Sequence, residues 1–130
     1  MATVDRQDPD PRADLHVTLA IEGDRAELIA EGNLDDFTAG LLRRHLSEAA
    51  ALGARRFVVT LRHVGLIDSS GLSALVFGYK LALRGGGEFT LQGDDRLVAR
   101  LLQRTGLDRV IPLRPVQPTV ADGQDRTAAS

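Results

Sequence analysis

Apolar and polar residues alternate in two neighbouring segments near the start of the chain, as they do in strands with one buried face. These segments are residues 17–21 and 26–30, and Glu22-Gly23-Asp24 between them is a turn signal. The pattern predicts a β-hairpin. A nearly continuous apolar run predicts a strand over 56–61 that is buried on both faces, and residues 88–92 predict one more short strand.

Three further segments carry apolar residues three or four positions apart, the spacing that gives a helix one buried face. The first opens at residues 35–36, where either aspartate can cap it, and the second spans about 70–84. The third spans about 94–106, where either Asp94 or Asp95 can open the helix and Gly106 ends it. The residues at this spacing are Phe37, Leu41, Leu42, His45, Leu46, Ala49 and Leu52 in the first helix, Leu72, Leu75, Val76, Tyr79 and Leu83 in the second, and Leu97, Val98, Leu101 and Leu102 in the third.

Two breaks follow the second and third helices. In Gly85-Gly86-Gly87, the first glycine is expected to take the left-handed conformation of a helix end. Val110-Ile111 is expected to add a last short strand, since the prolines beyond it prevent a helix. Strands thus alternate with helices after the hairpin, which predicts an α/β fold: one domain with a mixed, mostly parallel β-sheet and helices packed on it.

The chain has 130 residues, enough for one domain with a hydrophobic core and too few for two ordinary ones. Residues 1–14 are polar, contain Pro9 and Pro11 and show no apolar period, so we expect a disordered leader there. The domain is expected to span residues 15–113. The proline-punctuated end, residues 114–130, is expected to be a disordered tail.

Composition excludes several classes of function. A net charge of -2 and the lack of a basic run argue against nucleic acid as a direct partner. The chain has no cysteine, which excludes disulfides and thiolate chemistry. It shows neither a signal peptide nor an apolar run of membrane-spanning length, so we expect a cytoplasmic protein without a membrane span.

The segment from Leu66 to Leu72 carries the candidate chemistry, because an acid, two hydroxyls and a glycine stand there between a buried strand and a helix. Open α/β sheets place functional groups at this end of their strands. The simplest interpretation of a serine here is a helix cap, which needs one hydroxyl. If Ser70 caps the helix, the hydroxyl of Ser69 is left accessible. A phosphate on Ser69 would lie at the positive end of the helix dipole, which favours an anion, although the carboxylate of Asp68 would repel it. The loop predicts a phosphorylation switch.

No enzymatic site is expected. Ser69 lacks the Gly-x-Ser-x-Gly elbow of a serine hydrolase. His16, His45 and His63 stand on different elements without metal-ligand spacing, so each is interpreted as a surface or boundary residue. Gly85-Gly86-Gly87 lacks the Gly-Lys-Ser/Thr ending of a phosphate-binding loop. We therefore expect no catalytic residue, no metal and no bound cofactor.

Gly32-Asn33-Leu34-Asp35 and Asp68-Ser69-Ser70-Gly71-Leu72 are motifs with counterparts in a known family. They resemble the Gly-Glu-Leu-Asp turn and the Asp-Ser-Ser/Thr-Gly-Leu phosphorylation loop of STAS domains, most closely those of bacterial anti-sigma factor antagonists. The order of elements between about Leu15 and Leu113 also fits. Asn33 replaces the usual glutamate, and the proline-punctuated end has no counterpart to the family's terminal amphipathic helix.

The resemblance implies a partner switch that phosphorylation controls. A kinase-type anti-sigma factor would phosphorylate Ser69, with Ser70 as a secondary site, and a serine phosphatase would reverse the modification. The unphosphorylated chain would bind the anti-sigma factor and release a sigma factor, through a surface formed by Asp35, Asp68, Ser69, Ser70 and Gly71. We expect a monomer or weak dimer. The alternative is a STAS scaffold or accessory subunit of a stress-sensing or membrane-transport complex.

Overall fold

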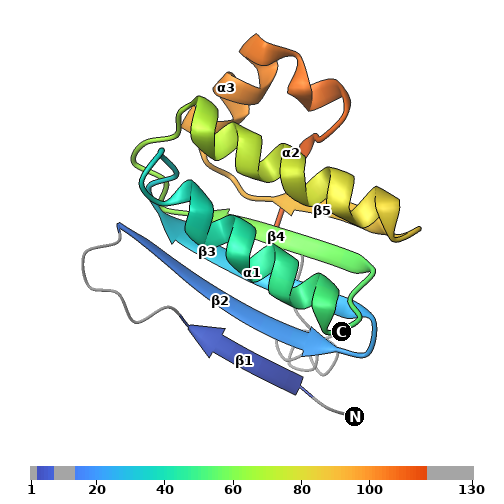
Figure 1. Ribbon diagram of the computed structural model, residues 1–130. Helices are drawn as coiled ribbons and strands as arrows, with labels where there is room; N and C mark the ends of the chain where they lie inside the picture. Colours follow the sequence, from blue (N-terminus) through green and yellow to red (C-terminus); the bar gives the residue numbers. More distant parts are fainter. Residues whose placement is uncertain (1–2, 8–13, 117–130) are drawn as a thin grey trace, which may run out of the picture.

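In the described part of the chain, six strands form one sheet, and neighbours in the chain are neighbours in the sheet, in the order β1-β2-β3-β4-β5-β6 (Figure 1). The computed structural model describes residues 3–7 and 14–116. The pairings of β2 with β1 and β3 are antiparallel, and the other three are parallel, which confirms the predicted mixed α/β fold. The strands are β1 (Thr3–Gln7), β2 (Leu15–Glu22), β3 (Arg25–Gly32), β4 (Arg56–Arg62), β5 (Glu88–Gln92) and β6 (Leu113–Arg114); the helices are α1 (Ala39–Ala51), α2 (Ser69–Arg84), α3 (Arg96–Thr105) and the short 3₁₀ helix η1 (Leu107–Arg109).

Helices α1 and α2 lie side by side across one face of the sheet, and α3 lies beyond α2, where it contacts β6 (Figure 1). The predicted hairpin places alternate residues under these helices. Val17, Leu19 and Leu28 are each 0% exposed. Burying a side chain of this size contributes about 1.5–3 kcal/mol. The main core therefore sits between this sheet face and the pair α1 and α2.

Helix α2 approaches the sheet through small residues. Ala74 and Gly78 are buried, and a Cβ at Gly78 would lie 2.7 Å from Phe89 Cε1. Leu72 and Leu75 are buried as predicted, but the contact face of the helix is rotated toward Ala74 and Gly78. Leu83, which the spacing placed on the buried face, is 52% exposed.

Helical spacing also misplaced residues at the ends of the other two helices. Phe37 is 64% exposed, Leu52 47% and Leu97 40%. Phe37 precedes α1 and Leu52 follows it, so the helical period does not set the direction of these side chains. His45 was interpreted as a surface or boundary residue but is buried, and its Nδ1 lies 2.9 Å from the carbonyl oxygen of Leu41.

The ends of α2 and α3 differ in how well the sequence predicted them. Asp95 caps α3 by accepting the amide of Leu97 at 2.9 Å, and Gly106 ends that helix with a φ of 78°, as predicted. After α2, Gly85 has a φ of -83° and Gly86 a φ of 74°. The second glycine, and not the first, therefore takes the left-handed conformation.

Strand β1 corrects the prediction of a disordered leader. It pairs antiparallel with β2, with Thr3 opposite Glu22. The backbone groups of an edge strand accept a further strand whatever side chains it carries, so this pairing needs no apolar period in the sequence. The described sheet therefore extends before the predicted start of the domain at residue 15. The rest of the predicted leader, residues 1–2 and 8–13, lies outside the described residues.

The last strand, β6, lies further along the chain than the predicted Val110–Ile111. The amides of Val110 and Ile111 both donate to the carbonyl oxygen of Leu107, at 3.0 and 2.7 Å. The turn after η1 therefore uses the two amides that would otherwise pair with a neighbouring strand. Arg114 belongs to β6 and pairs with β5, although it was assigned to the tail. Residues 117–130 of the predicted tail lie outside the described residues.

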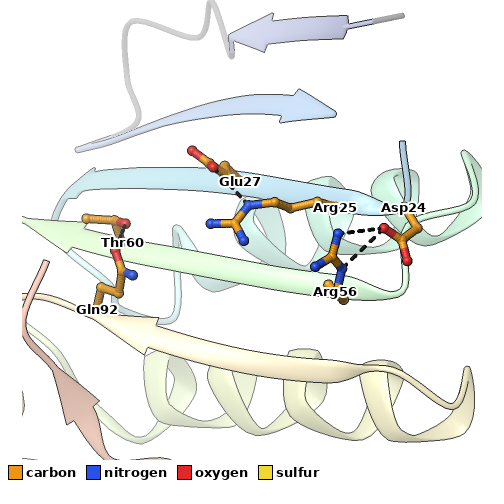
Figure 2. Close-up of polar contacts among 6 residues, drawn as sticks. All are labelled: Asp24, Arg25, Glu27, Arg56, Thr60 and Gln92. Atoms are coloured by element: carbon orange, nitrogen blue, oxygen red, sulfur yellow. Dashed lines mark hydrogen bonds and ion pairs between the residues drawn. The ribbon is translucent and has the colours of Figure 1, made fainter. Parts of the chain in front are cut away.

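Polar contacts occupy the sheet face that is turned away from α1 and α2 (Figure 2). Arg25 Nε donates to Glu27 Oε2 at 3.0 Å, and Thr60 Oγ1 donates to Gln92 Oε1 at 3.2 Å. Exposed ion pairs contribute only about 0–1 kcal/mol. These contacts pair polar groups of that face with one another, and they include none of the candidate site residues.

Candidate functional site

The two sequence motifs meet at the carboxyl ends of β3 and β4 through the backbone of Leu34. The amide of Leu34 donates to the carbonyl oxygen of Leu66 at 2.8 Å, and the amide of Asp68 donates to the carbonyl oxygen of Leu34 at 3.1 Å. The Leu34 side chain is 0% exposed. These bonds hold the turn that carries Asp35 against the loop that carries Ser69.

Gly71 permits this close approach. A Cβ at Gly71 would collide with the carbonyl oxygen of Leu34 and lie 2.8 Å from Leu34 Cβ. Gly71 is buried in the first turn of α2. It was predicted to belong to the partner-binding surface, but its burial assigns it a supporting role, because it lets the loop close on the turn.

Asp68, and not a serine, caps α2. Its Oδ1 accepts the amides of Ser70 at 2.9 Å and Gly71 at 3.2 Å. A carboxylate at this position also interacts favourably with the helix dipole. The interpretation of Ser70 as the cap is therefore wrong, and the hydroxyls of Ser69 and Ser70 are both left free of that task.

Asp35 closes the turn before α1 in a similar way. Its Oδ1 accepts the amides of Phe37 and Thr38, both at 3.0 Å. The helix itself begins at Ala39, without a side-chain cap, so the predicted cap by Asp35 or Asp36 is shifted to the preceding turn. Each motif thus contains an aspartate that stabilises its own loop.

The structure brings Asp35, Asp68, Ser69 and Ser70 together where α1 and α2 begin. Ser69 is exposed and the other three are half-buried. Both serines line an open depression of about 550 Å³ between the first turns of the two helices. The full lining is Asp36, Ala39, Gly40, Arg43, Ser69, Ser70 and Ser73.

Sequence reasoning missed two exposed apolar side chains that are close in the chain to the site residues. Phe37 is 64% exposed and Leu66 48%. Phe37 follows Asp36, which lines the depression. The carbonyl oxygen of Leu66 accepts a hydrogen bond from the amide of Leu34. Large exposed apolar side chains beside polar groups are typical of interaction surfaces. The only signal for Phe37 was its helical spacing, which assigned it to the core.

Arg43 is a further residue that the sequence did not indicate. Its Nη2 donates to Ser73 Oγ at 2.8 Å, and its guanidinium carbon lies 5.8 Å from the centroid of the Phe77 ring. This geometry brings a positive charge from α1 to the depression that Ser69 lines. An arginine on the polar side of a helix carries no sequence signal for such a contact, because 30 residues separate it from Ser73.

The described part of the chain was predicted to hold neither a metal site nor a membrane-spanning helix. His16 and His63 are exposed, whereas His45 is buried on α1. Within the described ranges, no cluster of three or more His, Cys, Asp or Glu side chains has the arrangement to hold a metal ion. Across the same ranges, every helix is too short or too polar to cross a bilayer.

The chain is similar to known proteins in both sequence and fold. The model of the STAS domain family matches residues 20–123. An anti-sigma F factor antagonist from Paenibacillus polymyxa is 30% identical over 102 residues, which cover 76% of this chain and 87% of that protein. The crystal structure of an anti-sigma factor antagonist from Mycobacterium paratuberculosis is similar with a TM-score of 0.69 at 23% identity, covering 92% of this chain and 97% of that one.

SpoIIAA, an anti-sigma factor antagonist and cell fate determinant of Bacillus, has the same fold. Its unphosphorylated form gives a TM-score of 0.68 at 17% identity, over 88% of this chain and 97% of that one. Its phosphorylated form gives 0.60 at 16% identity, over 85% of this chain and 98% of that one. The family model covers most of this sequence, and the Paenibacillus protein aligns along most of its own length. The predicted family is thus confirmed, and the chain belongs to the STAS domain family.

Proposed function

We propose that this chain is an anti-sigma factor antagonist whose binding to a kinase-type anti-sigma factor is switched off by phosphorylation of Ser69. One observation carries the proposal: Asp68 caps α2, while the Ser69 residue beside it is exposed. Phosphorylation of a capping serine would change the oxygen that accepts the first-turn amides. Ser69 has no such task, so phosphorylation changes the surface and leaves the helix cap in place.

The names of similar proteins support this assignment. The Paenibacillus relative is an anti-sigma F factor antagonist by name. SpoIIAA, which shares the fold, is described in both an unphosphorylated and a phosphorylated form. In the proposed cycle, the unphosphorylated chain binds its anti-sigma factor and so frees a sigma factor for transcription.

The proposed covalent step uses ATP bound to the anti-sigma factor. The oxygen of Ser69 attacks the γ-phosphorus, an O–P bond forms, the bridge to the β-phosphate breaks and ADP leaves. The hydroxyl proton passes to a base of the kinase. This chain contributes only the accessible hydroxyl, so it is a kinase substrate and binding module, without a catalytic residue, metal or cofactor of its own. A serine phosphatase hydrolyses the ester and restores the binding form.

The switch depends on the charge of the surface around Ser69. A phosphate adds about -1.5 to -2 charges at pH 7. Asp36 lines the same depression, and Asp68 directly precedes the serine. A partner docked over this loop meets a concentrated negative charge after phosphorylation. A loss of about 1.4 kcal/mol already weakens binding tenfold.

The location of the protein follows from the proposed chemistry. An ATP-dependent kinase and a sigma factor both act in the cytoplasm, so we place this chain there. Direct contact with nucleic acid is not part of the mechanism, since the net charge of the chain is -2. The chain acts as a monomer or weak dimer whose partner is the anti-sigma factor.

The test combines phosphorylation and binding. The chain is incubated with a candidate anti-sigma factor and ATP, and the product is analysed by intact mass and site mapping, beside a binding assay without ATP. Ser69→Ala is expected to lose the added phosphate and to keep binding. Ser73→Ala, one turn along the same helix, is the matched control and is expected to be phosphorylated like the wild type.

Two outcomes contradict the proposal. Stoichiometric phosphorylation of Ser69→Ala would assign the modification to another residue, and the Ser70→Ala variant then shows whether Ser70 is that residue. Tight binding without any phosphorylation would favour the scaffold or accessory subunit, which keeps the fold but has no switch.

A further inference from the structure

Hydrogen-bond donors or positive charge would stabilise a phosphate on Ser69, and the backbone at the start of α2 offers few free donors. Asp68 Oδ1 already accepts the amides of Ser70 at 2.9 Å and Gly71 at 3.2 Å. The amide of Leu72 donates to the carbonyl oxygen of Asp68 at 3.0 Å. The first-turn amides that bind anions at many helix ends are therefore engaged by the cap.

Arg43 supplies positive charge from the neighbouring helix. Its guanidinium donates to Ser73 Oγ at 2.8 Å and lies 5.8 Å from the centroid of the Phe77 ring. Ser73 follows Ser69 by four positions, so the two side chains are neighbours on one face of α2. Arg43, Ser69 and Ser73 line the same depression. The residue that the guanidinium contacts, Ser73, therefore lies one helical turn from Ser69.

We propose that Arg43 is the intramolecular partner of the phosphate on Ser69, an inference that rests on the function proposed above. On phosphorylation, the guanidinium exchanges its hydrogen bond to the uncharged hydroxyl of Ser73 for hydrogen bonds to the anionic oxygens of the phosphate. In these bonds both partners are charged, so Coulomb attraction adds to the hydrogen bonding. The planar guanidinium binds two oxygens at once, which a lysine ammonium does not match. The pair joins α1 to α2 across the depression.

The charges around the phosphate make this pairing measurable. Asp36 lines the depression, Asp68 precedes Ser69, and Asp35 lies in the turn that is held against the same loop. These carboxylates disfavour the dianionic phosphate and raise its second pKa, whereas a nearby guanidinium favours the dianion and lowers that pKa. The second pKa of the phosphate therefore reports whether Arg43 is paired with it.

The experiment uses the full chain with phosphoserine incorporated at position 69 during translation, so that no kinase is needed. A ³¹P NMR titration against pH measures the second pKa of the phosphate. Arg43→Gln is expected to raise this pKa by about 0.5 unit or more, because the cation that favours the dianion is removed. Arg43→Lys keeps the charge but not the planar fork, and it is expected to recover part of the shift. Arg84→Gln, at the opposite end of α2, is the matched control and is expected to leave the pKa unchanged.

Thermal unfolding gives a second readout. Phosphorylation is expected to raise the Tm of the wild type more than that of Arg43→Gln, and the unphosphorylated variant controls for its fold. An Arg43→Gln protein with the wild-type phosphate pKa and the same Tm difference would overturn the pairing. Failure of every candidate kinase to modify Ser69 contradicts the proposed function instead, and it does not affect this titration.

Discussion

Asp68 Oδ1 accepts the amide of Ser70 at 2.9 Å, so the side chain that caps α2 belongs to the residue directly before Ser69. This arrangement separates two tasks that one serine could otherwise combine. The aspartate supplies the cap at all times, while the hydroxyl of Ser69 is available for modification. The proposed switch therefore acts through surface charge and leaves the first turn of the helix intact.

The capping role of Asp68 predicts a difference between neighbouring substitutions. Asp68→Ala is expected to lower the free energy of unfolding by about 1 kcal/mol, because two first-turn amides lose their acceptor. Asp68→Asn keeps a side-chain oxygen and is expected to lose much less. Ser70→Ala is the control, with a change of at most about 0.5 kcal/mol. Urea unfolding followed by circular dichroism measures all three; equal losses for Ser70→Ala and Asp68→Ala would contradict the assignment of the cap.

The contact between Gly71 and Leu34 predicts opposite effects for two glycine substitutions. Gly71→Ala is expected to destabilise the fold by about 1–3 kcal/mol, because the added methyl group collides with the Leu34 backbone. Gly40→Ala on α1 is expected to stabilise it by about 0.5–1 kcal/mol, since no heavy atom lies within 4 Å of the added Cβ. Chemical denaturation of both variants measures the difference. A neutral Gly71→Ala would show that the loop and the turn separate at little cost.

The exposed ring of Phe37 predicts a binding defect without a stability defect. Phe37→Ala is expected to weaken binding to the anti-sigma factor about tenfold or more, as for an aromatic anchor at an interface. Its Tm is expected to stay close to that of the wild type, because the side chain is 64% exposed. Leu83→Ala is the matched control for both measurements, because the Leu83 side chain is 52% exposed and lies near the carboxyl end of α2, away from Ser69. Isothermal titration calorimetry gives the affinities, and wild-type affinity for Phe37→Ala would place the interface elsewhere.

The charge mechanism predicts that a carboxylate at position 69 imitates part of the modification. Ser69→Glu is expected to weaken binding to the anti-sigma factor by about tenfold or more, less than phosphorylation does, because it adds one negative charge and not nearly two. Ser47→Glu adds the same charge at an exposed site on α1 and is expected to bind like the wild type. The comparison is made by surface plasmon resonance at low and high salt. Equal losses for both variants would indicate an effect of net charge and not of the loop.

Local features of this protein could be predicted from the sequence because their partners are near in the chain. The alternation in residues 17–21 and 26–30 determined the hairpin, whose strands are joined by a short turn. Asp95 and Gly106 marked the ends of α3, since a cap involves residues within about one helical turn. The position of Ser69 between a buried strand and a helix was also visible in the pattern.

Contacts between distant segments were decided only by the tertiary structure. Arg43 and Ser73, which form a hydrogen bond, are 30 positions apart in the chain. Strand β1 pairs with β2 through backbone hydrogen bonds, which the pattern of side chains does not predict. The exposure of Phe37 and Leu83 likewise depended on where the helices end and how closely α2 packs at Gly78. A sequence pattern states which side of an element is apolar. It does not state the distance and rotation at which two elements pack. Those two quantities placed Arg43 beside Ser73.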